Sequence, residues 1–291
     1  MSDIIICDNL IKIYKTKDLE VLALQGLDLN IAAGELMAII GNSGSGKSTL
    51  LNMLGGLDRP SAGRLYVDGY DMNKISEQQL VEYKRDTVGF VWQNNARNLV
   101  PYLNALQNVS LPMMFGSEKQ KKDRALELLE LVGMAHKKHS RLNQLSGGEQ
   151  QRIAIAIALA NNPKILLADE PTGSVDVKTG NYILDVFREL NKSMGLTCVI
   201  VTHDPALAKK VNRVVRIRDG KTSSEMIVKE SYVDKLDSIS LFEEAHDEFA
   251  VLDKAGRVQL PKELLEQMQI TGNKVRLEYE DGRIIISNPK E

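Results

Sequence analysis

The chain has 291 residues, 43% of them hydrophobic, and its 37 basic and 39 acidic side chains leave a net charge of −2. This length allows one substantial core and a second, small unit, and the charge balance excludes a general attraction to nucleic acid or to anionic membranes. Cys7 and Cys198 lie far apart, which is typical of a reduced compartment and predicts ordinary buried thiols. No apolar run approaches the ~20 residues that cross a bilayer and no signal peptide begins the chain, so we expect a soluble, cytoplasmic protein.

The hydrophobic pattern predicts an α/β domain with a helical insertion. Residues 4–14 and 26–31 are predicted as strands, and the apolar run 35–40 as a fully buried strand. Helices are predicted at 77–85 and 118–132, with Leu126, Leu129 and Val132 on one face of the second. Strands at 164–169 and 197–203 flank a helix at 180–194, an order that indicates a parallel sheet. The polar segment from Lys221 is interpreted as a linker with room for one helix.

A glycine-rich segment, GNSGSGKS, fits the pattern G-x-x-x-x-G-K-[ST] directly after the buried strand at 35–40. Its glycines would let backbone N–H groups converge on phosphates at the N-terminus of a helix, whereas the alternative is a turn that binds nothing. Lys47 would reach the β- and γ-phosphates of ATP, and Ser48 would ligate Mg²⁺. The predicted nucleotide-binding residues of this segment are Gly41, Asn42, Ser43, Gly44, Ser45, Gly46, Lys47, Ser48 and Thr49.

The apolar segment ILLADE, residues 165–170, ends in two adjacent carboxylates, Asp169 and Glu170. Consecutive residues at a strand end point in different directions, so Asp169 can face the Mg²⁺ shell while Glu170 faces an attacking water. An acidic pair exposed on the surface is the alternative, but it would rarely follow four consecutive apolar residues.

The segment LSGGEQQR, residues 145–152, is the most discriminating in the chain. Ser146, Gly147, Gly148 and Glu149 open a helix, so a hydroxyl and free N–H groups would lie at its positive end and form a second anion site. Taken alone, Ser-Gly-Gly would be a helix cap and nothing more.

The order of these motifs, with VTHD following at Val201, resembles an ATP-binding-cassette (ABC) ATPase subunit over about residues 4–226. The resemblance implies a P-loop fold with a RecA-like core, a β-subdomain and a helical subdomain. It also implies ATP and Mg²⁺ as cofactors, with no other stable metal, and a homodimer. In that dimer each ATP lies between one subunit's P-loop and the other subunit's LSGG segment.

The resemblance assigns roles to four further residues. Tyr14 resembles the aromatic that stacks on adenine, although a lone Tyr after a strand would ordinarily pack. Gln93 is similar to the glutamine that touches Mg²⁺ and the attacking water. Asp176 matches a loop at the dimer interface, and His203 matches the switch histidine near the γ-phosphate. The pair in HKKH, residues 136–139, is interpreted as a solvated helix face because no acidic neighbour accompanies it.

Within this family the chain is most similar to the branch of macrolide-exporter, lipoprotein-releasing and cell-division ATPases. The similarity rests on LEVLALQGLDLNI, LLNMLGGLDRPSAG and DEPTGSVD. It implies an integral-membrane permease partner, peripheral attachment to the inner face of the cell membrane, and export of lipid, lipoprotein, peptide or drug cargo or mechanical work at the envelope. Asn42, where the branch usually has Pro, and GSVD, where Asn-Leu or Ala-Leu is commoner before the Asp, are mild departures from the sequence of this branch. Between Gln93 and Pro101 the chain is about two residues longer than usual, in a region that touches the permease.

The last segment, residues 247–291, is predicted as a separate domain after a 1–226 ATPase domain and a 227–246 linker. Strands at 248–253 and 257–260, a helix with Leu264, Leu265 and Met268 inward, and a hairpin with an Asp-Gly turn at Asp281 are predicted. So small a unit cannot bury enough surface alone, so we expect it to pair with a second copy. The pattern resembles the AbrB/SpoVT swapped-hairpin domain.

Three functions for this domain stay open. Domains of that family usually bind DNA through basic residues near the first turn, here Lys254 and Arg257, so a DNA-associated ATPase or transcription regulator is the alternative function. However, residues 247–291 hold seven basic and nine acidic side chains, which argues against DNA. The domain could instead hold two ATPase domains together or sense a ligand or protein. A soluble ABC protein of translation or chromosome maintenance is disfavoured, because there is no second cassette or long coiled coil.

Overall fold

The computed structural model describes residues 2–16, 19–93, 98–173, 175–204, 210–228, 246–253, 256–260, 262–270 and 274–288. The chain divides into two compact units, Met1–Phe249 and Ala250–Glu291, which are described separately. None of the helices in the described residues is both long and apolar enough to cross a membrane.

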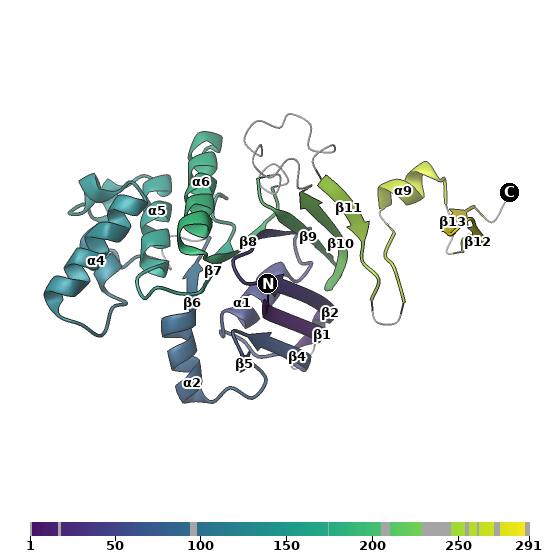
Figure 1. The fold of residues 1–291 in the computed structure, drawn as a ribbon, viewed down its shortest axis with the longest axis horizontal. Coiled ribbons are helices and arrows are strands. Elements are labelled where there is room, and N and C mark those ends of the chain that lie inside the picture. Colours follow the sequence, from purple (N-terminus) through teal and green to yellow (C-terminus); the bar gives the residue numbers. More distant parts are fainter. Residues whose placement is uncertain are drawn as a thin grey trace. The chain divides into compact units, whose positions relative to one another are not determined.

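The first unit is an α/β structure with two sheets (Figure 1). Its strands are β1 (Asp3–Lys15), β2 (Glu20–Ala32), β3 (Leu36–Ile40), β4 (Ala62–Val67), β5 (Tyr70–Asp71), β6 (Val88–Val91), β7 (Ile165–Asp169), β8 (Thr197–Thr202), β9 (Arg213–Arg218), β10 (Lys221–Val228) and β11 (His246–Ala250), whose last residue belongs to the second unit. Its helices are α1 (Lys47–Leu54), α2 (Glu77–Glu82), α3 (Ala105–Ser110), α4 (Glu118–Leu131), α5 (Gly147–Ala158) and α6 (Val177–Met194), with the short turns η1 (Tyr83–Thr87), η3 (Ala135–Lys137) and η4 (Leu142–Gln144).

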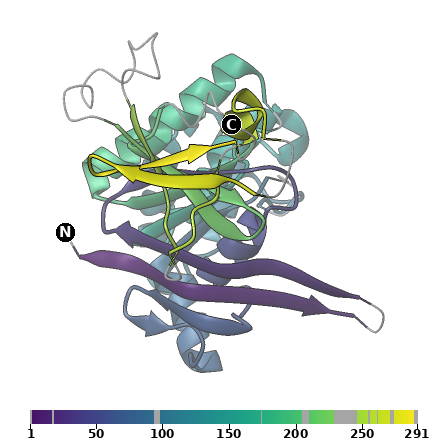
Figure 2. The same ribbon diagram turned by 90° about the vertical axis from the view of Figure 1, so that its right-hand side faces the viewer.

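The larger sheet has the order β11-β10-β9-β3-β8-β7-β6, and β3, β6, β7, β8 and β9 run parallel. The smaller sheet has the order β2-β1-β4-β5, and Figure 2 shows its long antiparallel β1–β2 hairpin. The predicted parallel sheet and the helix-rich middle of the chain are therefore present in the fold.

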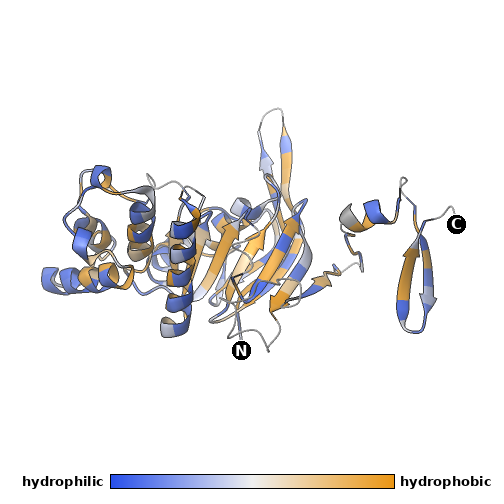
Figure 3. Cartoon of the chain, turned by 90° about the horizontal axis from the view of Figure 1, so that it is seen from above, coloured by the Kyte–Doolittle hydropathy of each residue, from blue (hydrophilic) through white to orange (hydrophobic). Residues whose placement is uncertain are grey.

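Two hydrophobic cores lie on the two faces of the larger sheet. In β3, Leu36, Ala38 and Ile40 join a core with α3, α4, α5 and α6. The alternate residues Met37 and Ile39 join a second core with α1 and the smaller sheet. A parallel strand that is covered on both faces has to be apolar at every position, which explains the continuous run that the sequence shows. Figure 3 shows this concentration of hydrophobic residues in the central strands.

Three predictions about local structure need correction. The helix predicted at 77–85 is regular only to Glu82 and then widens into the π-turn η1. On α4 the fully buried residues are Ala125, Leu128 and Leu129, whereas Leu126 is half-buried. The chain from Lys221 to Val228 is a strand and not a linker, and β9 before it was not predicted either. The rest of the predicted linker, residues 229–245, lies outside the described residues.

The second unit contains an isolated bridge between Leu252 and Val258, helix α9 (Lys262–Gln267) and the hairpin β12 (Arg276–Glu280) with β13 (Arg283–Ser287). The Asp281-Gly282 turn is confirmed, and both residues have positive φ, as this tight hairpin turn requires. The prediction that Leu264 points inward is wrong within one chain, because its side chain is exposed.

Candidate functional site

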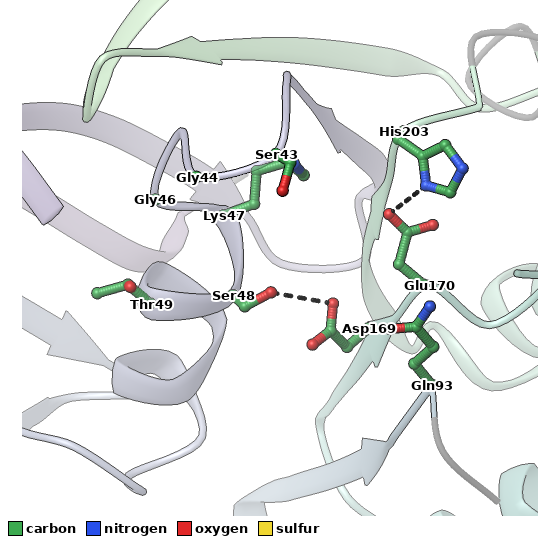
Figure 4. Close-up of a pocket in the computed structure, with 10 residues that line it drawn as sticks. All are labelled: Ser43, Gly44, Gly46, Lys47, Ser48, Thr49, Gln93, Asp169, Glu170 and His203. Atoms are coloured by element: carbon green, nitrogen blue, oxygen red, sulfur yellow. Dashed lines mark hydrogen bonds and ion pairs between the residues drawn. The ribbon is translucent and has the colours of Figure 1, made fainter.

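The parallel strands of the larger sheet bring their carboxyl ends together at one edge. Ile40 of β3 lies beside Thr202 of β8, and Asp169 of β7 lies beside Val201. In open α/β sheets ligands bind at this edge. A cavity of about 350 Å³ opens there, lined by Ser43, Gly44, Gly46, Lys47, Ser48, Thr49, Gln93, Asp169, Glu170 and His203 (Figure 4). Residues from four separate parts of the sequence therefore meet in one pocket.

The glycine-rich loop has the conformation that its sequence predicts. Gly44 and Gly46 have φ values of 78° and 102°, and α1 begins at the next residue, Lys47. At Gly41 a Cβ atom would lie 2.3 Å from the Ile217 carbonyl oxygen, so only glycine fits this approach to β9. The loop and the helix N-terminus form a concave surface of backbone N–H groups that suits phosphate oxygens.

Lys47 is buried, and its Nζ donates hydrogen bonds to the Gly41 and Asn42 carbonyl oxygens at 2.8 and 3.0 Å. Burial lowers the pKa of this lysine, while the carboxylates Glu170 and Asp169 oppose that shift. The ammonium group is therefore held against the phosphate-binding loop, within electrostatic range of the two acidic residues.

Asp169 and Glu170 divide between two sets of contacts. The Ser48 hydroxyl donates to Asp169 Oδ1 at 3.4 Å, so these two oxygens lie on the α1 side of the cavity. Glu170 has φ +47°, and its amide donates to the Val201 carbonyl oxygen at 2.9 Å. Its carboxylate accepts a hydrogen bond from the Thr202 hydroxyl at 3.2 Å and contacts His203 Nδ1 at 2.7 Å. Adjacent residues thus face different parts of the pocket, because β7 ends at Asp169 and Glu170 leaves the strand with a left-handed backbone conformation.

Gln93 follows β6 and lies at the edge of the cavity, beyond Asp169 (Figure 4). A Cβ atom at Gly173 would lie 3.3 Å from Gln93 Nε2, so the chain after Glu170 passes close to this amide. The sequence between Gln93 and Pro101 is longer than is usual for the branch, and residues 94–97 of it lie outside the described residues.

A second cluster lies at the N-termini of α5 and α6. The Ser146 hydroxyl accepts a hydrogen bond from the Glu149 amide at 3.3 Å, and Glu149 Oε2 accepts one from the Ser146 amide at 2.8 Å. These two residues form the capping box of α5. The Ser146 amide and the nearby Lys137 hold the pKa of Glu149 below its ordinary value. Among the described residues, those that line the cavity include none of this segment.

Asp176 caps α6 and belongs to the same cluster. Its carboxylate accepts hydrogen bonds from the Thr179 amide at 3.1 Å and the Thr179 hydroxyl at 2.6 Å, and these bonds lower its pKa. Thr179 in turn packs on Gly148, where a Cβ atom would lie 2.2 Å from Thr179 Cγ2. The LSGG glycine and Asp176, 28 positions apart, are therefore joined through one threonine.

Tyr14 lies on β1, 39% exposed, and its hydroxyl donates to Asp58 Oδ2 at 2.8 Å. Sequence reasoning missed Asp58, Thr179 and Thr202, which contact Tyr14, Asp176 and Glu170. Thr202 precedes His203 in the VTH segment and could have been found there. No sequence signal connects Asp58 with Tyr14, because 44 positions separate them and only the fold brings them together.

Curated proteins with similar sequences are ABC transporter ATP-binding proteins. An uncharacterised ABC transporter ATP-binding protein of Thermotoga maritima is 49% identical over 212 residues, which are 72% of this chain and 89% of the relative. The uncharacterised protein MJ0796 of Methanocaldococcus jannaschii is 44% identical over 75% of this chain and 94% of its own length. The macrolide export ATP-binding/permease protein MacB of Rhodopirellula baltica is 45% identical, and the match covers 33% of its length.

Solved structures agree with these relatives. Two dimeric structures of the cassette MJ0796, one of them bound to ADP and Pi, match with TM-scores of 0.71 and 0.70 at 43% and 42% identity. Each match covers 76% of this chain and 97% of that chain. CbiO1 of Clostridium perfringens matches with a TM-score of 0.70 at 30% identity, over 76% of this chain and 87% of its own. The family model described as ABC transporter matches residues 24–173. The chain therefore belongs to the ABC transporter family, as an ATP-binding subunit with an ATPase domain.

Proposed function

We propose that two copies of this chain bind two ATP molecules between them and hydrolyse them to drive a membrane permease. The observation that carries this proposal is the separation of the two anion-binding segments. Lys47, Ser48, Asp169 and Glu170 share one cavity, whereas Ser146 and Asp176 belong to another cluster. A second copy could bring the second cluster to the first cavity, and the solved structures of MJ0796 are dimers.

The roles of the cavity residues follow from their contacts. The loop of residues 41–49 would hold the phosphates, with Lys47 on the β- and γ-phosphates. Ser48, Asp169 and Gln93 would hold Mg²⁺, since the two facing oxygens of Ser48 and Asp169 are the hard donors this ion prefers. When bound, Mg²⁺ neutralises charge on the phosphates.

Glu170 would orient the attacking water, and His203 would lie near the γ-phosphate. Thr202 and His203 fix the Glu170 carboxylate on both oxygens, so its direction is set before ATP binds. Ser146, Gly147, Gly148, Glu149 and Asp176 of the second copy would close the site, because a helix N-terminus stabilises the charge that develops on the phosphate.

Glu170→Gln tests this assignment, because the amide keeps the shape of the side chain but cannot act as a base. We expect ATP hydrolysis to fall at least about 100-fold while ATP binding persists and an ATP-dependent dimer accumulates. Phosphate release and light scattering measure the two effects. Glu189→Gln, an exposed carboxylate on α6, is the matched control. Hydrolysis by Glu170→Gln within a few-fold of the wild type would show that another group orients the water.

The proposed transport function is export of a lipid, lipoprotein, peptide or drug, or mechanical work at the cell envelope. It is supported by the similarity to MacB, whose name joins an ATP-binding segment and a permease. In this chain the permease would be a separate protein, and attachment to it would place the subunit at the inner face of the cell membrane. Neither the family match nor the relatives add support for a DNA-associated alternative.

The C-terminal unit is proposed to be an AbrB/SpoVT-like dimerisation domain. Its hairpin places Leu277 opposite Ile286 and Tyr279 opposite Ile284, so these four side chains share one face. Leu277, Tyr279 and Ile284 are 65%, 75% and 73% exposed. In the described residues Arg257 is paired with Asp253 at 2.7 Å, while Lys254 lies outside them. An apolar face of this extent favours pairing with a second copy over DNA binding.

A further inference from the structure

The side chains of Lys12, Tyr14 and Asp58 form a polar cluster between β1 and the chain after α1. Asp58 follows α1, and its Oδ1 accepts a hydrogen bond from Lys12 Nζ at 2.5 Å while its Oδ2 accepts one from the Tyr14 hydroxyl at 2.8 Å. Lys12 Nζ also donates to the Arg59 carbonyl oxygen at 2.9 Å and lies 4.9 Å from the centre of the Tyr14 ring. Asp58 therefore contacts the hydroxyl of Tyr14, and Lys12 contacts its ring.

These contacts are stronger than those of an ordinary surface ion pair. The side chain of Lys12 is 12% exposed and that of Asp58 is 27% exposed. Burial alone would raise the pKa of Asp58, but the hydrogen bonds from Lys12, Tyr14 and the Arg59 amide outweigh it and lower the pKa. Burial and the bond to Asp58 raise the pKa of Tyr14, so the phenol stays a donor and the carboxylate stays an acceptor.

The cluster lies directly against the phosphate-binding loop. Lys12 is paired with Leu24 of β2, and the neighbouring Ala23 carbonyl oxygen would be only 2.6 Å from a Cβ atom at Gly46. Thr49 of α1 interacts with the Tyr14 hydroxyl. Figure 4 shows Thr49 on the side of α1 away from Asp169. Tyr14 therefore adjoins the end of the cavity opposite the catalytic carboxylates, where the base of a bound nucleotide would lie.

We propose that Asp58 is a positioning residue for the nucleotide base. The Asp58 carboxylate accepts hydrogen bonds from the Tyr14 hydroxyl and from the Lys12 ammonium. These bonds fix the plane of the Tyr14 ring beside α1. Tyr14 as a residue is 39% exposed, and the Lys12 ammonium lies over its ring, so the exposed part of the side chain is available to a purine. This role rests on the proposed stacking of adenine on Tyr14. A ring that is already fixed loses less conformational freedom when the base stacks on it.

The test compares the affinities of the full-length protein for ADP and for inorganic triphosphate by calorimetry. Tyr14→Phe keeps the ring but removes the hydroxyl, and Asp58→Ala removes the acceptor. We expect each to weaken ADP binding about fivefold to tenfold, part of the value of a stacked base, and to leave triphosphate binding within about twofold. In ATP hydrolysis the same loss appears in KM rather than in kcat. The double variant should bind ADP no more weakly than Asp58→Ala, because both changes break one contact.

Glu20→Gln is the matched control, since it breaks the exposed Lys15–Glu20 ion pair on the same hairpin and should change neither affinity. Equal weakening of ADP and triphosphate by Asp58→Ala would overturn the proposal, since that is the result of a general loss of packing. Unchanged ADP affinity in Asp58→Ala would overturn it as well. If the wild type binds triphosphate but gains nothing from the adenosine of ADP, stacking on Tyr14 is wrong; if it binds neither, the phosphate site itself is wrong.

Discussion

At the scale of single residues, backbone strain coincides with the candidate catalytic position. Glu170 is a non-glycine residue with φ +47°, a conformation that costs of order 1–3 kcal/mol. The hydrogen bond from its backbone amide to the Val201 carbonyl oxygen and its side-chain contacts with Thr202 and His203 hold it there. The sequence predicted the carboxylate but not its conformation, because three partners from β8 and the residue after it determine the conformation.

Gly148 provides a residue-scale prediction about stability. A Cβ atom there would lie 2.2 Å from Thr179 Cγ2, so Gly148→Ala should lower the free energy of unfolding by about 1–3 kcal/mol through overpacking. Thr179→Ser removes that methyl group and keeps the hydroxyl that bonds to Asp176. In the Thr179→Ser background the same change should be nearly neutral, since alanine favours the helix by up to ~1 kcal/mol. Urea unfolding of the four proteins measures the coupling, and additive effects would contradict this account of Gly148.

At the scale of secondary structure, the hydrophobic pattern was sufficient to predict the buried strands and insufficient to predict β10. Strand β3 is apolar throughout, and β7 and β8 are apolar apart from residues at their ends, so their prediction from hydrophobic runs is confirmed. Strand β10 has a polar sequence because its hydroxyls find backbone partners. Ser223 donates to the Arg216 carbonyl oxygen at 3.0 Å and Thr222 to the Asp28 carbonyl oxygen at 2.8 Å. Such partners come from other strands, so the sequence of this segment alone indicates a loop.

The C-terminal hairpin supplies the prediction at this scale. Leu277→Glu with Ile284→Glu puts charges on its exposed apolar face. If that face pairs two chains, the wild type should be a dimer without ATP and the double variant a monomer, because buried, unpaired carboxylates strongly oppose association. Light scattering on a sizing column measures the mass.

Ser287→Glu is the control for this experiment, because it adds a charge on the other face of the hairpin, opposite Arg276. It should leave the dimer intact. A monomeric wild type, or a double variant that remains dimeric without ATP, would show that the hairpin face does not hold the chains together.

At the scale of the whole molecule, the proposed function requires a second copy of the chain. The chain holds the two halves of the proposed site in separate clusters, one at the edge of the larger sheet and one at the N-termini of α5 and α6. The helical part also exposes Tyr102, Leu111 and Met114, at 76%, 58% and 74%. Tyr102 precedes α3, and Leu111 and Met114 follow it, and exposed apolar side chains of this kind are typical of a protein interface.

We expect a polytopic membrane protein to co-purify with the chain through this surface. Leu111→Lys with Met114→Lys should abolish co-purification, because charged groups would be buried in an apolar interface. Mass spectrometry of complexes extracted from membranes identifies the partner. Met194→Lys, which adds a charge at an exposed apolar residue at the end of α6, should retain it. Equal recovery of the partner with the double variant and with the wild type would exclude this surface as the contact.

The sequence by itself determined the order of strand, phosphate-binding loop and helix, the strands that the larger sheet buries on both faces, the helix that opens at the LSGG segment, and the Asp281-Gly282 turn. Each of these depends on neighbours within a few positions, or on burial that makes every residue of a strand apolar. Only the tertiary structure decided that β10 is a strand, that Thr179 joins Gly148 to Asp176, and that Asp58 holds Tyr14. These depend on contacts between parts of the chain that the fold brings together, and a local pattern carries no information about which parts will meet.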